Sequence, residues 1–338
     1  MSGGRLGLKV AGVVALAAVI PFLTLGCGTN KTNPAAGGPN DPNWPDRPGP
    51  KVVVSFAPLY CFAANVAGDD AVVKNVMTTT GPHDFNPTAD DVKVLTQAEI
   101  FFVIGLELDE AKAETMKKGS GNGNLKIVEL GEKIPKDKRC EGKCEHADHK
   151  PGDKHEHGDD PHVWLSPDHA AIMVNAIRDE LKTADPAHAA GYDQRAAAYI
   201  TKLQALKTDG RALLKDKKER RIVSFHDSLA YFEKAYDVEV RGVLTQKPGQ
   251  EPDEKQMKKL IRICTDEAKP TRVIAVEPQY STSNAGEALK KELAAKGLTG
   301  VELVEIDPLE TVRPDDLTPD WYENKMRENV TKLAEKLK

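Results

Sequence analysis

The sequence predicts an α/β protein made of two similar lobes, each a four-stranded parallel sheet with flanking helices. Short apolar, β-branched segments such as KVVVSFAP at residues 51–58 alternate with helical segments, as in parallel sheets covered by helices. The order strand, helix, strand, helix, strand, helix, strand occurs twice along the chain. The tripeptide VSF at residues 54–56 in the first half also recurs at residues 223–225 in the second.

The first lobe is predicted from apolar runs that end at proline, glycine or polar residues. Thr88 can cap a helix, and Asp90 and Asp91 place two acidic side chains in its first turn. Pro167 suits the first position of a later helix. Strands are expected at residues 51–58, 71–78, 100–105 and 125–130, and helices at 60–66, 88–98, 107–117 and 167–184.

A long helix is expected between the lobes. The pair Asp185-Pro186 ends the preceding helix, and residues 187–217 then have a helical pattern with almost no interruption. At about 1.5 Å per residue this helix is on the order of 45 Å long. Such a helix can act as one rigid strut that joins two lobes.

The second lobe repeats the pattern of the first. Strands are expected at residues 221–225, 238–244, 271–276 and 301–306, and helices at 227–235, 253–268, 284–296 and 319–338. Because ligands of open α/β sheets bind beyond the carboxyl ends of the strands, a ligand is expected in the cleft between the two lobes.

The N-terminus has the composition of a secretory signal. Arg5 and Lys9 precede an apolar run that ends at Gly26 and Cys27, as in bacterial lipoprotein signals whose cysteine is lipidated. The alternative is a soluble secreted protein in which Cys27 is incidental. The predicted divisions are residues 1–27 for the signal, 28–50 for a flexible tether, 51–186 for the first lobe, 187–217 for the linking helix and 218–338 for the second lobe.

A histidine-rich loop is predicted at residues 140–158. Its histidines stand among Lys, Asp, Glu and Gly, with little apolar material to bury, which indicates a mobile, metal-capturing loop. The alternative is a charged, solvated loop without a metal. Cys140 and Cys144 are expected either to pair or to add thiolates to the loop. The histidines of this loop are His146, His149, His155 and His157.

Further candidate ligands follow the predicted strands. His83, His162 and His226 lie beyond strand ends of the two lobes, and Asp307 follows the last strand. Three imidazoles and one carboxylate suit a tetrahedral Zn²⁺ site. Glu277, which follows another strand of the second lobe, is expected to be an extra ligand or to orient an imidazole. The other two histidines, His169 and His188, are interpreted as surface residues on helices.

Composition narrows the possible partners. The chain has 338 residues and a formal net charge of -5, which argues against a nucleic-acid partner. A membrane partner is expected only through the lipid anchor, because the body has no apolar run of about 18 residues. A monomer is predicted.

Five motifs together resemble the metal-binding class of solute-binding lipoproteins of ABC transporters, specifically its zinc branch. They are GPHDFNPT, DDPHVWLSP, FHDSLAYFEKAYDV, VEPQYS and EIDPLE, and the resemblance covers residues 51–338. It implies two lobes joined by one long helix with little hinge motion. The ligands that it implies are His83, His162, His226 and Asp307.

The resemblance also implies a function outside the cytoplasmic membrane: capture of Zn²⁺ and its delivery to a permease driven by an ATPase. A carboxylate in place of His226 and no histidine-rich loop would be typical of the manganese branch. The chain departs from the family pattern at Asn86, Ser166 and Glu310, where Glu, Asp and Gly are usual.

Alternative functions are a Mn²⁺- or Fe²⁺-binding member of the same class and a metal-dependent adhesin. A zinc hydrolase is a remote alternative, since the sequence has no HExxH and no glycine-flanked nucleophilic serine. The protein is therefore predicted not to be an enzyme.

Overall fold

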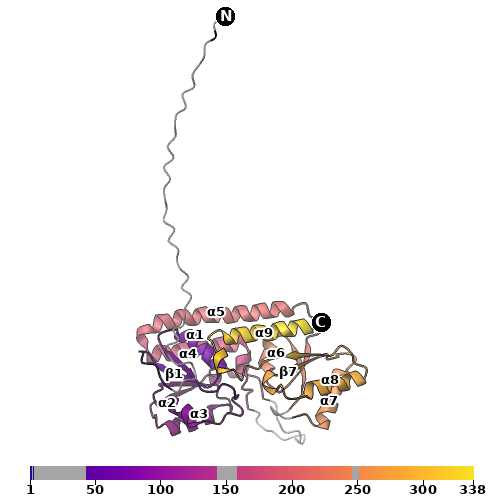
Figure 1. Cartoon of the computed structure of the whole chain (residues 1–338), viewed down its shortest axis with the longest axis horizontal. Helices are drawn as coiled ribbons and strands as arrows, with labels where there is room; N and C mark the ends of the chain where they lie inside the picture. Colours follow the sequence, from indigo (N-terminus) through magenta and orange to yellow (C-terminus); the bar gives the residue numbers. More distant parts are fainter. Residues whose placement is uncertain (2, 4–42, 143–157, 246–250) are drawn as a thin grey trace. The chain divides into compact units, whose positions relative to one another are not determined.

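The computed structural model describes residues 1, 3, 43–142, 158–245 and 251–338 (Figure 1). Apart from residues 1 and 3, the predicted signal with Cys27 lies outside the described residues, as do the tether up to residue 42, Cys144 and the four loop histidines. Residues from Asn43 onward belong to one compact unit. Within the described residues, no helix has the length and apolar character needed to cross a membrane.

The first lobe is a parallel sheet with strand order β2-β1-β3-β4. Its strands pair in register, with Val52 opposite both Val73 and Ile100. The strands are β1 (Lys51–Val54), β2 (Val72–Asn75), β3 (Ile100–Val103) and β4 (Lys126–Glu129), and the helices are α1 (Ala57–Ala67), α2 (Ala89–Leu95), α3 (Glu110–Ser120) and α4 (Pro167–Ala184).

The second lobe has the same topology, with strand order β6-β5-β7-β8, so the predicted two-lobed α/β fold is confirmed. Its strands are β5 (Arg221–Ser224), β6 (Glu239–Val243), β7 (Val273–Val276) and β8 (Glu302–Glu305), and its helices are α6 (Ala230–Tyr236), α7 (Glu254–Cys264), α8 (Ala285–Ala295) and α9 (Trp321–Lys336). Short 3-10 helices lie at Gly131–Lys133, Lys136–Lys138, Val163–Leu165, Pro186–His188, Pro278–Tyr280 and Pro314–Asp316.

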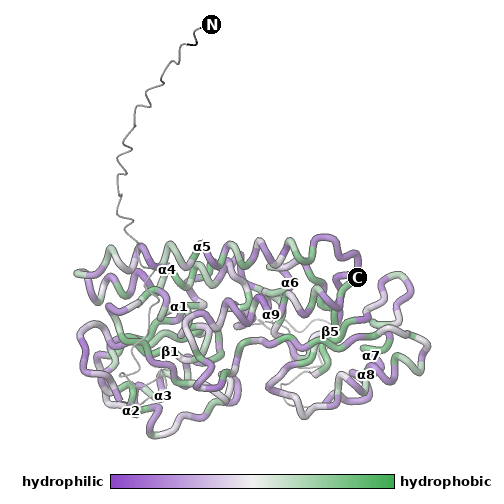
Figure 2. The backbone as a smooth tube through the Cα atoms, turned by 45° about the horizontal axis from the view of Figure 1, so that its top comes forward, coloured by the Kyte–Doolittle hydropathy of each residue, from purple (hydrophilic) through white to green (hydrophobic). Residues whose placement is uncertain are grey.

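The helix that joins the lobes is α5 (Ala189–Leu214). It packs against α1 and α4 of the first lobe and against α6 and α9 of the second. The C-terminal helix α9 lies beside α5 and also contacts α1 (Figure 1). Hydrophilic and hydrophobic colours alternate along α5, as expected of a helix with one packed face (Figure 2).

Strand ends differ from the prediction where a helix begins early. β1 was expected to reach Pro58 but ends at Val54, because α1 already begins at Ala57. Pro58 lies in the first turn of α1, where its missing N–H costs no helical hydrogen bond. The indole of Trp44 donates to the carbonyl of Val94, which places the end of the predicted tether on the first lobe.

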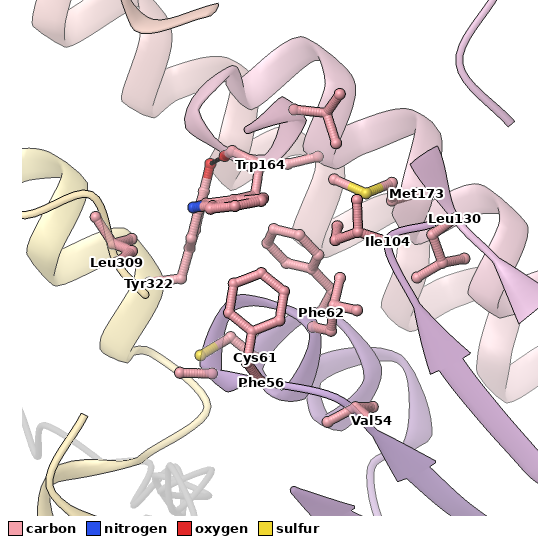
Figure 3. Close-up of a cluster of buried hydrophobic side chains, with 14 of the residues drawn as sticks. Val54, Phe56, Cys61, Phe62, Ile104, Leu130, Trp164, Met173, Leu309 and Tyr322 are labelled. Atoms are coloured by element: carbon pink, nitrogen blue, oxygen red, sulfur yellow. Dashed lines mark hydrogen bonds between the residues drawn. The ribbon is translucent and has the colours of Figure 1, made fainter. Parts of the chain in front are cut away.

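Two buried hydrogen bonds join the lobes around Trp164. Its indole Nε1 donates to the carbonyl of Pro308 (2.8 Å), and the Tyr322 hydroxyl donates to the carbonyl of Trp164 (2.7 Å). Phe56 packs edge-on against Trp164, and Phe62 packs edge-on against Tyr322 (Figure 3). The aromatic core therefore crosses from one lobe to the other just beyond His162.

The interpretation of His169 as a surface residue is wrong. Its side chain is buried and packs edge-on against Tyr231, and its Nδ1 has no hydrogen-bond partner. Burial lowers the pKa of His169 to about 4. The imidazole is therefore neutral in the folded protein at neutral pH.

We predict that acid destabilises the metal-free protein partly through His169. The unfolded chain takes up a proton on this residue below about pH 6.5, whereas the folded chain does so only near pH 4, so stability falls across that interval. His169→Leu should lose less stability than the wild type between pH 7 and 4.5, measured by urea unfolding. Equal losses in both proteins would contradict the role given to His169.

Candidate metal centre

Four side chains from both lobes meet beyond the carboxyl ends of the strands. His83 lies between β2 and α2, and His162 immediately precedes the 3-10 helix Val163–Leu165. His226 follows β5, and Glu310 follows β8. One ligand atom from each of these residues lies within 4.8 Å of every other. The structure thus brings together the three histidines that the sequence singled out, with Glu310 as the fourth group.

The spacing of these atoms fits a small tetrahedral ion. Glu310 Oε1 lies 3.6 Å from Nε2 of His83, 3.4 Å from that of His162 and 3.3 Å from that of His226. The Nε2 atoms of His83 and His162 are 3.3 Å apart. A tetrahedron with Zn–N bonds of about 2.0–2.1 Å has edges of about 3.3 Å. These four separations are therefore close to those of ligands around one Zn²⁺.

The inward-facing atoms also lack other partners. His226 Nε2 and Glu310 Oε1 are buried and have no hydrogen-bond partner among the described residues outside this group of four. Buried polar atoms without partners are costly, so they require a further group. Three imidazole nitrogens and a carboxylate oxygen are ligands that suit zinc. A divalent cation would satisfy both unpaired atoms.

Carboxylates behind two of the histidines fix the orientation of their rings. Asp160 Oδ1 lies 2.9 Å from Nδ1 of His162 and also accepts from the His162 backbone N–H. Both oxygens of Glu277 lie near Nδ1 of His226, at 2.6 and 2.8 Å. Such partners leave Nε2 free to bind a metal and raise its basicity. Glu277 thus occupies the position of an orienting partner.

The electrostatics of the metal-free site reflect this arrangement. Burial acts to lower the pKa of His162, but hydrogen bonds to Asp160 and Glu310 outweigh it and raise the pKa to about 9. Burial also acts to lower the pKa of His226, but the negative charges of Glu277 and Glu310 outweigh it and hold that pKa well above its usual value. For Glu310, burial would raise the pKa, but His226 and the hydrogen bonds to the histidines hold it well below its usual value. Protonated imidazoles thus provide the positive charge that the carboxylates require.

Asp307, expected as the fourth ligand, is not brought into this group. Its Oδ1 accepts from the backbone N–H of Leu309 (2.8 Å), and Asn329 of α9 binds its backbone N–H and carbonyl. Burial raises the pKa of Asp307 to about 6. Leu309 has a positive φ of 64°. Asp307 therefore stabilises the turn that carries Glu310 to the histidines.

The stems of the histidine-rich loop meet beside this site. The N–H of Gly142 donates to the carbonyl of Gly158, and that of Asp160 donates to the carbonyl of Cys140. The Tyr231 hydroxyl, from the second lobe, donates to the carbonyl of Asp160 and accepts from the N–H of Cys140. Cys140 is buried and forms no disulfide with another described residue. Its pairing with Cys144, or their joint binding of a metal, stays open because Cys144 lies outside the described residues.

Comparison with known proteins finds similarity to one family over most of the chain. The family model described as "ZnuA: Zinc-uptake complex component A periplasmic" matches residues 52–336. The zinc-binding protein AdcA of Streptococcus pyogenes is 31% identical over 296 residues, which cover 84% of this chain and 55% of that protein. The chain thus spans about half the length of the curated relatives that it matches first.

Two further proteins resemble most of the chain. The high-affinity zinc uptake system protein ZnuA of Bacillus subtilis is 28% identical over 291 residues, covering 85% of this chain and 86% of that protein. The solute-binding protein FpvC of Pseudomonas aeruginosa, solved in complex with Mn²⁺, has a TM-score of 0.72 and 26% identity. That match covers 85% of this chain and 98% of FpvC.

We predict that Glu277→Gln lowers the pKa of His226 in the metal-free protein. Burial favours the neutral imidazole, and the variant lacks the negative charge near Nδ1 that counteracts this effect. NMR titration of the imidazole measures the change. Asp307→Asn is the matched control, since Asp307 does not contact His226, and it should leave the pKa within experimental error. Equal shifts in both variants would contradict the pairing of Glu277 with His226.

Proposed function

The chain belongs to the family of zinc-uptake complex component A, and from this premise we propose that it captures Zn²⁺ outside the cytoplasmic membrane. The observation that carries the proposal is the group of three imidazole nitrogens and one carboxylate oxygen that lie within 4.8 Å of one another, with the oxygen 3.3–3.6 Å from each nitrogen. His83, His162, His226 and Glu310 would hold the ion. Delivery follows to the permease and ATPase of an ABC transporter, since the family is described as one component of an uptake complex.

The same geometry argues for a carrier rather than an enzyme. Catalytic zinc sites have three protein ligands and keep one position open for water, whereas this group supplies four. The ion is therefore enclosed as cargo. We propose that the protein binds and releases zinc without chemical change.

Zinc is favoured over manganese or iron by the donor atoms. Three nitrogens and one oxygen supply four donor atoms, fewer than the six, mostly oxygen, that Mn²⁺ usually takes. The affinity order of divalent ions also places Zn²⁺ above Mn²⁺ and Fe²⁺ at nitrogen-rich sites. The number of donor atoms and the affinity order thus favour Zn²⁺ over Mn²⁺, and the affinity order favours it over Fe²⁺.

The function is tested by metal analysis and competition titration of protein that lacks residues 143–157. This deletion removes the loop histidines, and its ends already meet through the hydrogen bond between Gly142 and Gly158. We expect one tightly bound Zn²⁺ per chain and weaker binding of Mn²⁺. Tighter binding of Mn²⁺, or no tight site, would contradict the proposal.

We predict that Glu310→Gln weakens zinc binding by about two orders of magnitude, because a buried anionic ligand becomes neutral. Asp307→Asn is the control and should change the affinity by no more than about threefold, since Asn can still accept from the Leu309 N–H. Competition with a chelator of known affinity gives both values. A larger loss in Asp307→Asn than in Glu310→Gln would restore Asp307 as the ligand.

We also propose that the protein is exported and held at the membrane by a lipid on Cys27. The support is the position of this cysteine directly after the apolar run of the signal. Cys27→Ser should release the protein into the soluble fraction, because the variant cannot be lipidated and so lacks its membrane anchor. Fractionation of cells and immunoblotting measure this. Membrane association of the variant with its signal cut would argue against lipidation.

A further inference from the structure

His83 is the least enclosed of the four groups around the site. Its side chain is 30% exposed, compared with 5% for His162, 3% for His226 and 2% for Glu310. Asp160 and Glu277 stand behind the other two rings, but none of the described residues pairs with Nδ1 of His83. The position of His83 therefore depends on the backbone that carries it.

That backbone is the loop between β2 and α2. At its start, the N–H of Val312 from the second lobe donates to the carbonyl of Thr78. At its end, Thr88 and Asp91 form a capping box that begins α2. Between these fixed ends the N–H of Asp84 donates to the carbonyl of Gly81, which closes a turn around His83.

Lys112 of α3 holds the middle of this loop. Its Nζ donates to the carbonyl oxygens of Pro82 (2.5 Å) and His83 (3.1 Å). Hydrogen bonds from a charged donor are stronger than those between neutral groups. Lys112 thus fixes the peptide groups on both sides of the His83 Cα atom, from outside the loop and without contacting the metal position.

A small displacement of the loop would directly change the geometry of the metal site. A Cβ atom on Gly81 would lie 3.3 Å from Cβ of Glu310, so the loop backbone runs against the fourth ligand. Loosening this segment would move His83 relative to Glu310. The other three ligands would be unaffected, since their own partners hold them.

We propose that Lys112 is a positioning residue that holds His83 at the metal and thereby sets how long the ion stays bound. This inference rests on the proposed function in that the bound ion is Zn²⁺. With Lys112 in place, the His83 imidazole stays within bonding distance of the ion and detaches from it rarely. Without it, the loop samples positions in which His83 is detached, and the ion departs through the exposed side of the site.

The test compares Lys112→Met with Lys118→Met in the protein lacking residues 143–157. Lys118 lies on the same helix, is exposed, and its side chain makes no hydrogen bond or ion pair among the described residues. Stopped-flow chase of bound Zn²⁺ with excess chelator measures dissociation. We expect about tenfold faster dissociation in Lys112→Met, as for loss of one or two hydrogen bonds, and no change in Lys118→Met.

A double variant separates positioning from a general loss of stability. In a His83→Ala background, Lys112→Met should cause no further acceleration, because its effect acts through His83. Lys112→Arg, which keeps a charged donor, should recover part of the slow dissociation. Full additivity of Lys112→Met and His83→Ala would overturn the proposal, as would wild-type dissociation in Lys112→Met.

Hydrogen exchange of the metal-free protein gives a measurement that does not depend on zinc. Amides at residues 79–86 should exchange faster in Lys112→Met than in Lys118→Met, while those of α2 and β2 stay unchanged. If the wild type bound no zinc tightly, the proposed function would fail while this measurement still tested the hold on the loop. Unchanged exchange at residues 79–86 would contradict that hold.

Discussion

The hydrogen bond from the Trp164 indole to the carbonyl of Pro308 fixes the two halves of the metal site relative to each other. Trp164 follows His162 by two residues, and Pro308 precedes Glu310 by two. Tyr322 binds the backbone of Trp164 from α9, and all three groups are buried. A buried group left without its partner costs about 1–3 kcal/mol, so separation of the lobes at this point is strongly opposed.

This constraint holds together a site that is built from both lobes. The distance between His162 and Glu310 is set by buried backbone and aromatic groups rather than by the metal. The metal-free site then keeps its ligands together, with Glu310 balanced by protonated imidazoles. Zinc binding would exchange these protons for the ion, since the metal ligands must be deprotonated.

The order of strands and helices could be predicted because apolar runs and capping residues are local signals. The meeting of His83, His162 and His226 followed from topology, since parallel strands bring their carboxyl ends to one edge. Glu310 could not be found in this way. Asp307 is closer to the end of β8, but the chain makes a further turn at Leu309, whose positive φ no local pattern indicates. Burial of His169 depends on Tyr231, a partner distant in sequence.

The four proposed ligands are supported unequally, so the site has one fixed side and one side that can open. His162 and His226 are held by buried carboxylates, and Glu310 is held by the turn that Asp307 stabilises. These three groups form a fixed, enclosed side of the proposed coordination sphere. His83 completes it from an exposed loop, so an ion can meet the fixed half first and be closed in by a local movement. Under the proposed function, exchange of the ion would then require displacement of one loop, and the buried contacts between the lobes could stay intact.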